Sequence, residues 1–566
     1  MGKTEIKKIN CDILIIGGGS AGLWAARSAK LKNPALHVVI ADKANTDWGG
    51  LMSLSGGDLE VCMPPDSPDD WVKDFIYYWD GLCEQDVVAD IWSHSWEIFE
   101  EYEKMGCQYL KKEDGAYQTV PQRSLGHVKL FPVKTKGTGG PDMRQCMIRE
   151  MDRLQVTRMG RVEITELFKD GDRICGAAGF HIVTGEALLF SAKAVILCTG
   201  NMGWKPSYNN NTTSGEGQSL AFRAGARLRN CEFLHIWNVP KLFEWEGQTV
   251  LMPLGAKFVN RHGENFMEKY SPRLGANTDP HYITRGMALE MKAGRGPIRL
   301  DLSAIPESAR PIIRPAAGRH LLHYEKLLEE GIDFFEDQFE WITQVQLGNG
   351  AIVTDGQGYT GIPGLYAAGR CRSIDPGVYM GGFALMTTAI TGRQAGEEAA
   401  GYVSSVDSGT INGQEAEHSL EQTLAPLGKE GAAPKEVLRR IQALISHCDV
   451  SILKTEKALK MALEELQEIR EEWIPNMGAA DSHYLLKLEE VRAIANATEY
   501  NLTSALFRKD SRAGHYRADY PEHYDDWLCW TVLDNRDGRP VPSKMPVPIE
   551  GYKYPVERYY ADNFTF

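Results

Sequence analysis

The sequence has no paired cysteine motif, no long apolar run and no concentration of positive charge. Its eleven cysteines are scattered without a Cys-x-x-Cys pair, so we predict no zinc or iron–sulfur site within this chain. No apolar run is long enough to span a bilayer, so a membrane link would have to come through another subunit. The net charge of −14, with Lys and Arg interspersed, argues against nucleic acid as a partner.

The N-terminus lacks the charged segment and apolar core of a signal peptide, and the scattered cysteines argue against a disulfide framework. Both observations lead us to expect a cytoplasmic protein. The length of 566 residues exceeds one ordinary hydrophobic core, so several domains are expected.

A glycine-rich turn close to the N-terminus is the most informative pattern. The apolar run Cys11–Ile16 predicts a buried strand, and Gly17-Gly-Gly-Ser-Ala-Gly22 follows it before a helix-like segment. Gly17, Gly19 and Gly22 have the GxGxxG spacing, in which free backbone N–H groups and the helix N-terminus bind a dinucleotide pyrophosphate. A coincidental glycine turn is the competing interpretation.

A second apolar strand, residues 37–41, ends in Asp42, twenty residues after Gly22. An acid at this place can accept a hydrogen bond from a ribose hydroxyl and disfavours the 2′-phosphate of NADP. These two strands therefore predict a dinucleotide site, but they do not distinguish FAD from NAD.

Several later segments extend this pattern. Residues 47–58 form a glycine-rich return, an apolar strand ends in Thr199-Gly200, and another ends in Gly369. A small-residue segment after Gly382 predicts a helix whose N-terminus points at the ligand. Aromatic residues spaced by three or four between 69 and 106 predict helices with a buried aromatic face.

Five motifs, in order along the chain, resemble the flavoprotein subunits of succinate dehydrogenase and fumarate reductase, with adenylylsulfate reductase alpha subunits as a related branch. They are the N-terminal turn and residues 214–228, 255–267, 294–302 and 364–396. The resemblance implies FAD rather than NAD. Residues 504–521 are most similar to the adenylylsulfate reductase branch, whose alpha subunits work with a small ferredoxin-like iron–sulfur protein. We therefore expect a hetero-oligomer with such a partner.

The expected fold is α/β, with a Rossmann-like FAD-binding domain, an inserted capping domain and a C-terminal helical domain. The FAD-binding domain is expected in two parts, 8–235 and 346–403, on either side of a capping domain at 236–345. Residues 404–433 have the composition of a linker. A helical domain at 434–530 and an extended tail at 531–566 complete the prediction, with Arg508, Arg512 and Arg517 expected to tie the helical domain to the FAD-binding domain.

The glycine turns and the resemblance together give nineteen candidate FAD-binding residues. They are Gly17, Gly19, Ser20, Ala21, Gly22, Asp42, Lys43, Gly49, Gly50, Ser55, Gly56, Gly57, Thr199, Gly200, Glu216, Gly369, Arg370, Gly382 and Leu385. Family members with covalent flavin have a His before the Gly-Gly pair. Gly50 stands at about that place, so we predict non-covalent FAD.

The chain departs from the family at the substrate positions. Asp375-Pro-Gly-Val-Tyr379 replaces a His-x-x-Asn-Arg group that clamps a substrate carboxylate, and Pro280 replaces a proton-donating arginine. Tyr and Pro supply no bidentate cation, so succinate and fumarate are poor candidates. Arg370 also stands where the family has an acid near the ribityl chain.

Four residues are candidates for catalysis. Arg285 could bind an anion or donate a proton, and His235 could act as an acid or base. His281 and Tyr379 could contact substrate. Each has an ordinary structural alternative: an ion pair for Arg285, a packed or surface histidine for His235, a polar loop residue for His281 and core packing for Tyr379.

The expected function is an FAD-dependent two-electron oxidoreductase acting on a small anionic substrate and resembling the adenylylsulfate reductase alpha subunit. One alternative is an ene-reductase or dehydrogenase of a substituted carboxylate. Another is a non-catalytic flavin electron-relay subunit of a larger complex.

Overall fold

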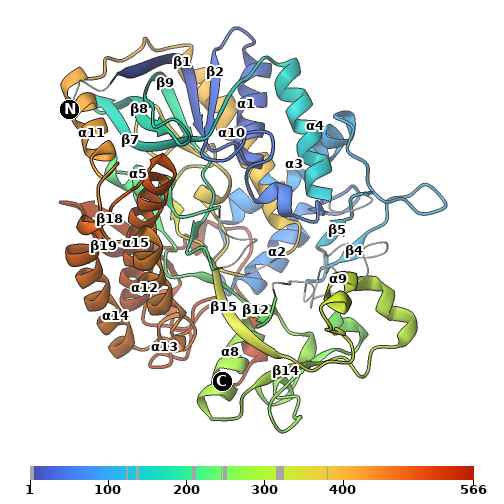
Figure 1. Ribbon diagram of the computed structural model, residues 1–566. Coiled ribbons are helices and arrows are strands. Elements are labelled where there is room, and N and C mark those ends of the chain that lie inside the picture. Colours follow the sequence, from blue (N-terminus) through green and yellow to red (C-terminus); the bar gives the residue numbers. More distant parts are fainter. Residues whose placement is uncertain are drawn as a thin grey trace.

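The computed structural model describes residues 5–122, 125–135, 139–206, 212–243, 245, 251–313, 324–378 and 380–566. Its central sheet has the strand order β6-β2-β1-β9-β8-β7, and β17 pairs with β9 (Figure 1). The strands are β1 (Ile6–Ile16), β2 (Val38–Asp42), β6 (Thr157–Gly160), β7 (Val162–Asp170), β8 (Arg173–His181), β9 (Ala187–Leu197) and β17 (Leu365–Ala367).

Two helices pack closely on one face of this sheet. They are α1 (Ser20–Lys32) and α10 (Phe383–Val403). A Cβ added at Gly392 would lie 2.4 Å from the carbonyl oxygen of Ala21, and one at Gly396 would lie 2.2 Å from that of Ala25. The small residues of α10 therefore let the two backbones touch, with the start of α1 beside the middle of α10.

The aromatic segment 69–106 forms two helices, as predicted. These are α2 (Pro68–Tyr78) and α3 (Gln85–Lys104). Trp71, Phe75, Trp92, Phe99 and Tyr102 are all buried, because their spacing places them on the inner faces of the pair. A small sheet of β3 (Leu59–Glu60), β5 (Lys129–Phe131) and β4 (Val120–Pro121) and the helix α4 (Gly139–Arg153) complete this region.

A second sheet lies between the two parts of the first domain, in the green and yellow part of Figure 1. Its order is β10-β15-β14-β13, with β12 paired to β15. Its elements are β10 (Met202–Gly203), β12 (Leu234–Pro240), β13 (Lys257–Val259), β14 (Ile298–Asp301) and β15 (Glu340–Gly348), with α7 (Met267–Tyr270), α8 (Pro280–Lys292) and α9 (Tyr324–Glu329). The segment 236–345 predicted as a capping domain lies within this unit.

The helical region follows in the C-terminal third. Its helices are α12 (Pro434–Ser446), α13 (Cys448–Ser451), α14 (Glu456–Glu468) and α15 (Ser482–Phe507). Arg508 at the end of α15 forms an ion pair of 2.7 Å with Glu232, and both side chains are fully buried. Arg512 donates to the backbone oxygen of Asp80, whereas Arg517 bonds within its own region. Arg508 thus provides the buried ion pair expected between the two domains.

Two expectations about the chain's connections are wrong. The segment 404–433, predicted to be a linker, contains α11 (Gly413–Leu424), whose Ala416 and Leu420 are buried against apolar residues of β7 and β8. The tail 531–566 is not simply extended, because it begins within a hairpin of β18 (Cys529–Arg536) and β19 (Arg539–Pro546). This hairpin continues a sheet with β11 (Leu228–Arg229) and β16 (Ala351–Ile352), so backbone pairing outweighs its Pro-rich composition.

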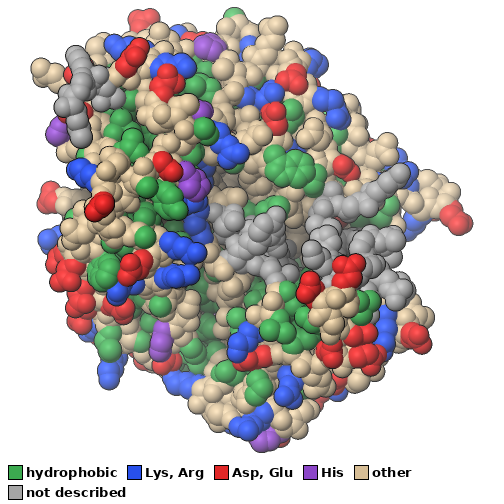
Figure 2. Space-filling view, in the orientation of Figure 1, with side chains coloured by type: hydrophobic (Ala, Val, Ile, Leu, Met, Phe, Trp, Pro, Cys, Tyr) green, Lys and Arg blue, Asp and Glu red, His purple; other side chains and the backbone are tan. Residues whose placement is uncertain are grey.

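In the described ranges, no helix combines the length and apolarity that crossing a membrane requires. On the face shown in Figure 2, acidic and basic side chains are intermixed. That distribution agrees with the interspersed charge of the sequence.

Candidate active site

A cavity of about 580 Å³ runs along the carboxyl ends of β1, β2 and β9 and reaches the N-terminus of α10. Sixteen of the nineteen candidate FAD-binding residues lie on its wall. They are Gly17, Gly19, Ser20, Ala21, Asp42, Lys43, Gly50, Ser55, Gly56, Gly57, Thr199, Gly200, Glu216, Arg370, Gly382 and Leu385. Segments far apart in the sequence therefore form one continuous surface, as expected of a site for an elongated dinucleotide.

The other three candidates pack behind that surface. A Cβ at Gly22 would lie 2.0 Å from the oxygen of Gly17, and one at Gly49 would lie 2.9 Å from the Cβ of Ala44. Gly369 has a φ of +67° and leaves 2.6 Å between its ideal Cβ and that of Ala21. These glycines permit close backbone packing rather than lining the cavity themselves.

The first glycine turn is shaped for a phosphate group. Gly17 has a φ of +103°, and a Cβ there would lie 2.4 Å from the oxygen of Cys198. Gly19 caps α1 without a side chain, so N–H groups of the first turn are left for a ligand. Asp42 accepts from the backbone N–H of Gly18 and, at 2.6 Å, from that of Ala44, which holds its carboxylate at the turn.

Arg144 on α4 supports this turn from behind, and it was not among the predicted residues. Its guanidinium donates to the backbone oxygen of Gly18 at 2.8 Å and also to that of Thr46. The N-terminus of α4 donates to the second glycine loop, from Gly139 to the oxygen of Gly56 at 3.0 Å. No local motif marks Arg144, because its partners lie about a hundred residues earlier in the chain.

Beyond Asp42, the cavity ends at a buried charged cluster. Lys43 forms ion pairs with Glu216 and Glu490, and Glu490 also pairs with Lys205 at 2.6 Å. Glu163 lies beside them. Its pKa is raised well above the usual value, first by burial and then by the charge of Glu216.

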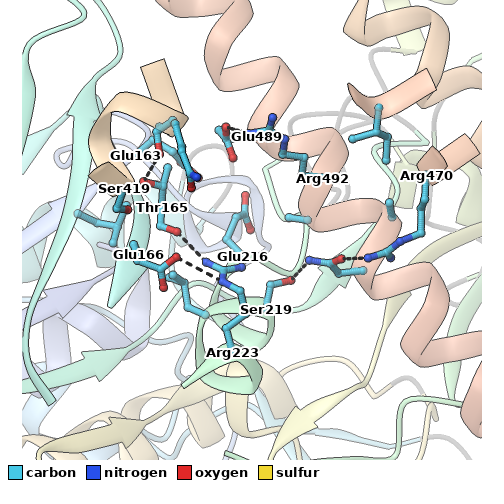
Figure 3. Close-up of a pocket in the computed structure, with 18 residues that line it drawn as sticks. Glu163, Thr165, Glu166, Glu216, Ser219, Arg223, Ser419, Arg470, Glu489 and Arg492 are labelled. Carbon is cyan, nitrogen blue, oxygen red and sulfur yellow. Dashed lines mark hydrogen bonds and ion pairs between the residues drawn. The ribbon is translucent and has the colours of Figure 1, made fainter. Parts of the chain in front are cut away.

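A second cavity of about 540 Å³ adjoins this cluster, and Glu163 and Glu216 line both cavities. Figure 3 shows two ion pairs on its wall, one between Arg223 and Glu166 and one between Arg492 and Glu489. The arginines that line it are thus engaged by neighbouring carboxylates.

The other end of the main cavity carries a group of ionisable side chains, which we call the reaction end: His235, Arg370 and Asp375. Arg370 contacts Asp375 at 2.5 Å and Asn349 at 3.2 Å. The second carboxylate oxygen of Asp375 pairs with Nε2 of His235 at 3.2 Å and accepts from Asn349. Asp375 is buried. Its contacts with Arg370, His235 and Asn349 hold its carboxylate in place.

The surroundings set the protonation of this group. Burial lowers the pKa of His235, and the charge of Arg370 lowers it further, although Asp375 acts in the opposite direction. Burial would raise the pKa of Asp375, but the charge of Arg370 and the bond from His235 outweigh that effect and lower it. Near pH 7 the imidazole is therefore neutral and the carboxylate is ionised.

Apolar side chains form much of the remaining wall of the cavity. They are Leu51, Leu54, Trp237, Trp245, Leu347, Val378 and Met380. None of them was predicted as a site residue, because single apolar residues in strands and loops have no local signature of a ligand wall.

Arg285 and His281 are not on this wall. Arg285 lies on α8, where its guanidinium stacks on the rings of Tyr282, Tyr516 and Phe566 at 4.4 to 4.8 Å. His281 bonds to Asp279 at the start of the same helix, close enough to His235 for its charge to lower the pKa of that residue. Tyr379 lies outside the described residues.

Comparison with known families identifies the family of this chain and its cofactor. The FAD binding domain family matches residues 12–385, and the fumarate reductase flavoprotein C-terminal family matches residues 439–560. The chain belongs to the fumarate reductase and succinate dehydrogenase flavoprotein family. It is an FAD-dependent oxidoreductase, which confirms FAD as the expected cofactor.

The relatives match over nearly their whole length. The fumarate reductase flavoprotein subunit of Mycobacterium tuberculosis is 28% identical over 593 aligned residues, covering 97% of this chain and 99% of the relative. A chain of the CoM/CoB fumarate reductase of Methanothermobacter marburgensis is 26% identical, with 95% of this chain and 99% of the relative covered.

Solved structures show the same fold. A variant of the E. coli quinol fumarate reductase superposes with a TM-score of 0.86 at 22% identity, covering 98% of this chain and 99% of that one. Adenylylsulfate reductase from Archaeoglobus fulgidus superposes with a TM-score of 0.81 at 22% identity, covering 98% of both chains. The predicted fold class is therefore confirmed.

Proposed function

We propose that this chain is the flavoprotein subunit of an oxidoreductase that moves two electrons between FAD and a small anionic substrate. A ferredoxin-like iron–sulfur subunit would exchange electrons with it in a cytoplasmic hetero-oligomer. The observation that carries the proposal is that His235, Arg370 and Asp375 lie on the wall of the same cavity as the glycine turns. Bound FAD supplies hydride or electron transfer at its N5 atom.

The residues of the first glycine turn would hold the pyrophosphate, and Asp42 would accept from a ribose hydroxyl. The N-terminus of α10 lines the opposite end of the cavity. Its N-cap residue is Gly382, so no side chain caps the helix. Its positive end would favour negative charge next to it. We further propose that FAD is bound non-covalently, because Gly50 offers no side chain for attachment.

His235 is the residue best placed to move a proton at the reaction end. Its neutral imidazole can accept a proton from a substrate and return it, while Asp375 fixes the orientation of the ring. Arg370 pairs with Asp375, and its charge favours the neutral form of the His235 imidazole, which is the form that can accept a proton.

The named relatives support an anionic substrate, since fumarate is a dicarboxylate and adenylylsulfate carries phosphate and sulfate groups. Fumarate itself is disfavoured here, because Pro280 and Tyr379 replace the arginines expected to bind and protonate it. We therefore place adenylylsulfate and related anions ahead of unsubstituted dicarboxylates.

A second candidate function is reduction or dehydrogenation of a substituted carboxylate. The observation that favours it is the apolar part of the cavity wall, where Trp237, Trp245 and Leu347 would contact the body of the substrate. A hydrophobic wall recognises an apolar or aromatic substituent better than a short dicarboxylate.

An anaerobic reoxidation screen tests these proposals. The flavin is reduced with a low-potential dye and then mixed with adenylylsulfate, fumarate or a series of substituted enoates. In a separate sample, oxidised flavin is mixed with sulfite plus AMP, whose oxidation to adenylylsulfate would reduce it. Recovery of oxidised flavin absorbance with one adenylyl anion supports the first function, and recovery with a substituted enoate supports the second. No recovery with any of them, combined with rapid electron exchange with a co-purified iron–sulfur protein, would favour the non-catalytic relay.

A further inference from the structure

Two cysteines are neighbours in the region that supports the glycine loops. Cys107 follows the end of α3, and Cys146 lies in the middle of α4. Each thiol shifts the pKa of the other, which places the two side chains close together, and both cysteines are free and buried. An ideal Cβ at the adjacent Gly106 would lie 3.9 Å from Sγ of Cys146, which places this turn directly against the second sulfur.

A positive charge accompanies the second thiol. Arg149, one helical turn further along α4, donates from Nη2 to Sγ of Cys146 at 3.1 Å. The Arg149 side chain is exposed, so the two sulfurs lie just beneath the protein surface. A guanidinium next to a sulfur favours the thiolate, which is the reactive form of cysteine.

The two thiols differ in acidity. The hydrogen bond from Cys107, with the charge of Arg149, lowers the pKa of Cys146 to about 7 despite burial. The same bond and burial raise the pKa of Cys107. The other nine cysteines, which all lie within the described ranges, have raised pKa values.

We propose that Cys107 and Cys146 are a redox-active dithiol that a peroxide converts to a disulfide. The Cys146 thiolate attacks the peroxide, an S–O bond forms as the O–O bond breaks, and sulfur is oxidised by two electrons to sulfenic acid. The Cys107 sulfur then attacks Cys146, forming the S–S bond as the hydroxyl leaves as water. Overall, two thiols and hydrogen peroxide give one disulfide and two waters.

The position of the pair connects this chemistry to the cofactor. The helix that carries Cys146 also carries Arg144, which bonds to Gly18, and Gly139, which bonds to Gly56. A disulfide to Cys107 would therefore join the end of α3 to the helix that supports both glycine loops of the FAD site.

Peroxide treatment of the FAD-loaded protein tests the proposal. Hydrogen peroxide is added, remaining thiols are blocked with N-ethylmaleimide under denaturing conditions, and disulfide-linked peptides are mapped by mass spectrometry. We expect a Cys107–Cys146 linked peptide as the main product in the wild-type chain. It should be absent from Cys107→Ser, whose Cys146 should instead accumulate sulfenic and sulfinic acid.

Three further variants separate the reactivity of the thiols from their exposure. Cys448→Ser removes a more exposed cysteine and should leave the yield unchanged, whereas Arg149→Met should slow disulfide formation by about three- to tenfold. Arg149→Lys should restore much of the rate. A wild-type protein in which Cys107 remains alkylatable after Cys146 has been oxidised would overturn the proposal, as would a linked peptide no more abundant than those of other cysteine pairs.

Discussion

The two ends of the main cavity are built from different parts of the chain. The cofactor end, comprising the Gly17–Gly22 turn and Asp42, is made mostly of backbone from one short βαβ segment. The reaction end is made of side chains brought together by the fold, and His235 and Asp375 are separated by 140 positions. Under the proposed function, cofactor binding would depend on local backbone shape, whereas substrate choice would depend on side chains that are distant in the sequence.

The largest expected effect comes from closing the cofactor end. Gly17→Ala would place a methyl group against the oxygen of Cys198 and force an L-residue to a φ of +103°. We expect FAD affinity to fall by more than about 100-fold. The flavin-to-protein absorbance ratio of the purified variant, and titration of the apoprotein with FAD, measure this loss.

Gly171→Ala is the matched control, because Gly171 also has a positive φ, of +62°, but has no atom near its ideal Cβ. It should retain FAD with only a modest loss of stability, of about 1 kcal/mol. Equal FAD loss in both variants would show that glycine strain anywhere in the domain releases the cofactor, and the comparison between the two ends would fail.

The second effect separates the reaction end from the cofactor end. His235→Asn should keep FAD but slow reoxidation of the reduced flavin by the substrate by about 10²- to 10⁴-fold, because the proton acceptor is removed. Rapid mixing with the substrate identified by the reoxidation screen measures this rate. His418→Asn, on the exposed side of α11, should change nothing. A full rate in His235→Asn would remove this residue from the mechanism.

The third prediction concerns the buried ion pair that adjoins the reaction end. Arg508→Met leaves Glu232 buried without its partner, three positions before His235, and should lower the free energy of unfolding by about 3–5 kcal/mol. Urea titration followed by circular dichroism measures this change. Lys460→Met breaks an exposed pair with Glu456 and should cost no more than about 0.5 kcal/mol. Similar losses of unfolding free energy in Arg508→Met and Lys460→Met would mean that the Arg508 pair contributes little to joining the domains.

The cofactor end was largely predictable from sequence, because glycine spacing and strand ends are local features that reflect backbone geometry. Gly17, Gly19 and Asp42 needed only their immediate neighbours to be recognised. Composition is also a local feature, and reliance on it explains the wrong assignments of residues 404–433 and of the tail. The composition of 404–433 and of the tail says little about whether those segments find a sheet or a domain surface to pack against.

The reaction end was only partly predictable. His235 was selected as a possible acid or base and Arg370 as a departure from the family, but the contact that joins them through Asp375 requires the full fold. Arg144, Trp237 and Trp245 carry no local signal. The surroundings of Arg285, three aromatic rings from separate segments, likewise required the full fold.

The fourth prediction tests that contrast directly. Arg285→Met should lower stability by about 2 kcal/mol through the loss of three cation–π contacts. It should change the flavin reoxidation rate much less than His235→Asn does, since Arg285 does not line the cavity. Unfolding curves and single-turnover rates on the same preparation provide both values. A loss of rate equal to that of His235→Asn, with FAD retained, would return Arg285 to the reaction end.

The smallest effect is the pH dependence of stability that His235 contributes. Its pKa is lowered in the folded protein, so the unfolded chain takes up the proton first as the pH falls below about 6.5. The contribution of His235 to stability is therefore fully present above that pH and declines until the folded imidazole also protonates.

Between pH 7.5 and 5.5, urea titrations should show a smaller loss of stability in His235→Asn than in the wild type. Part of the slope should remain, because the pKa of buried His515 is also lowered. The exposed His418→Asn should retain the wild-type slope, and an unchanged slope in His235→Asn would mean that His235 does not resist protonation in the folded state.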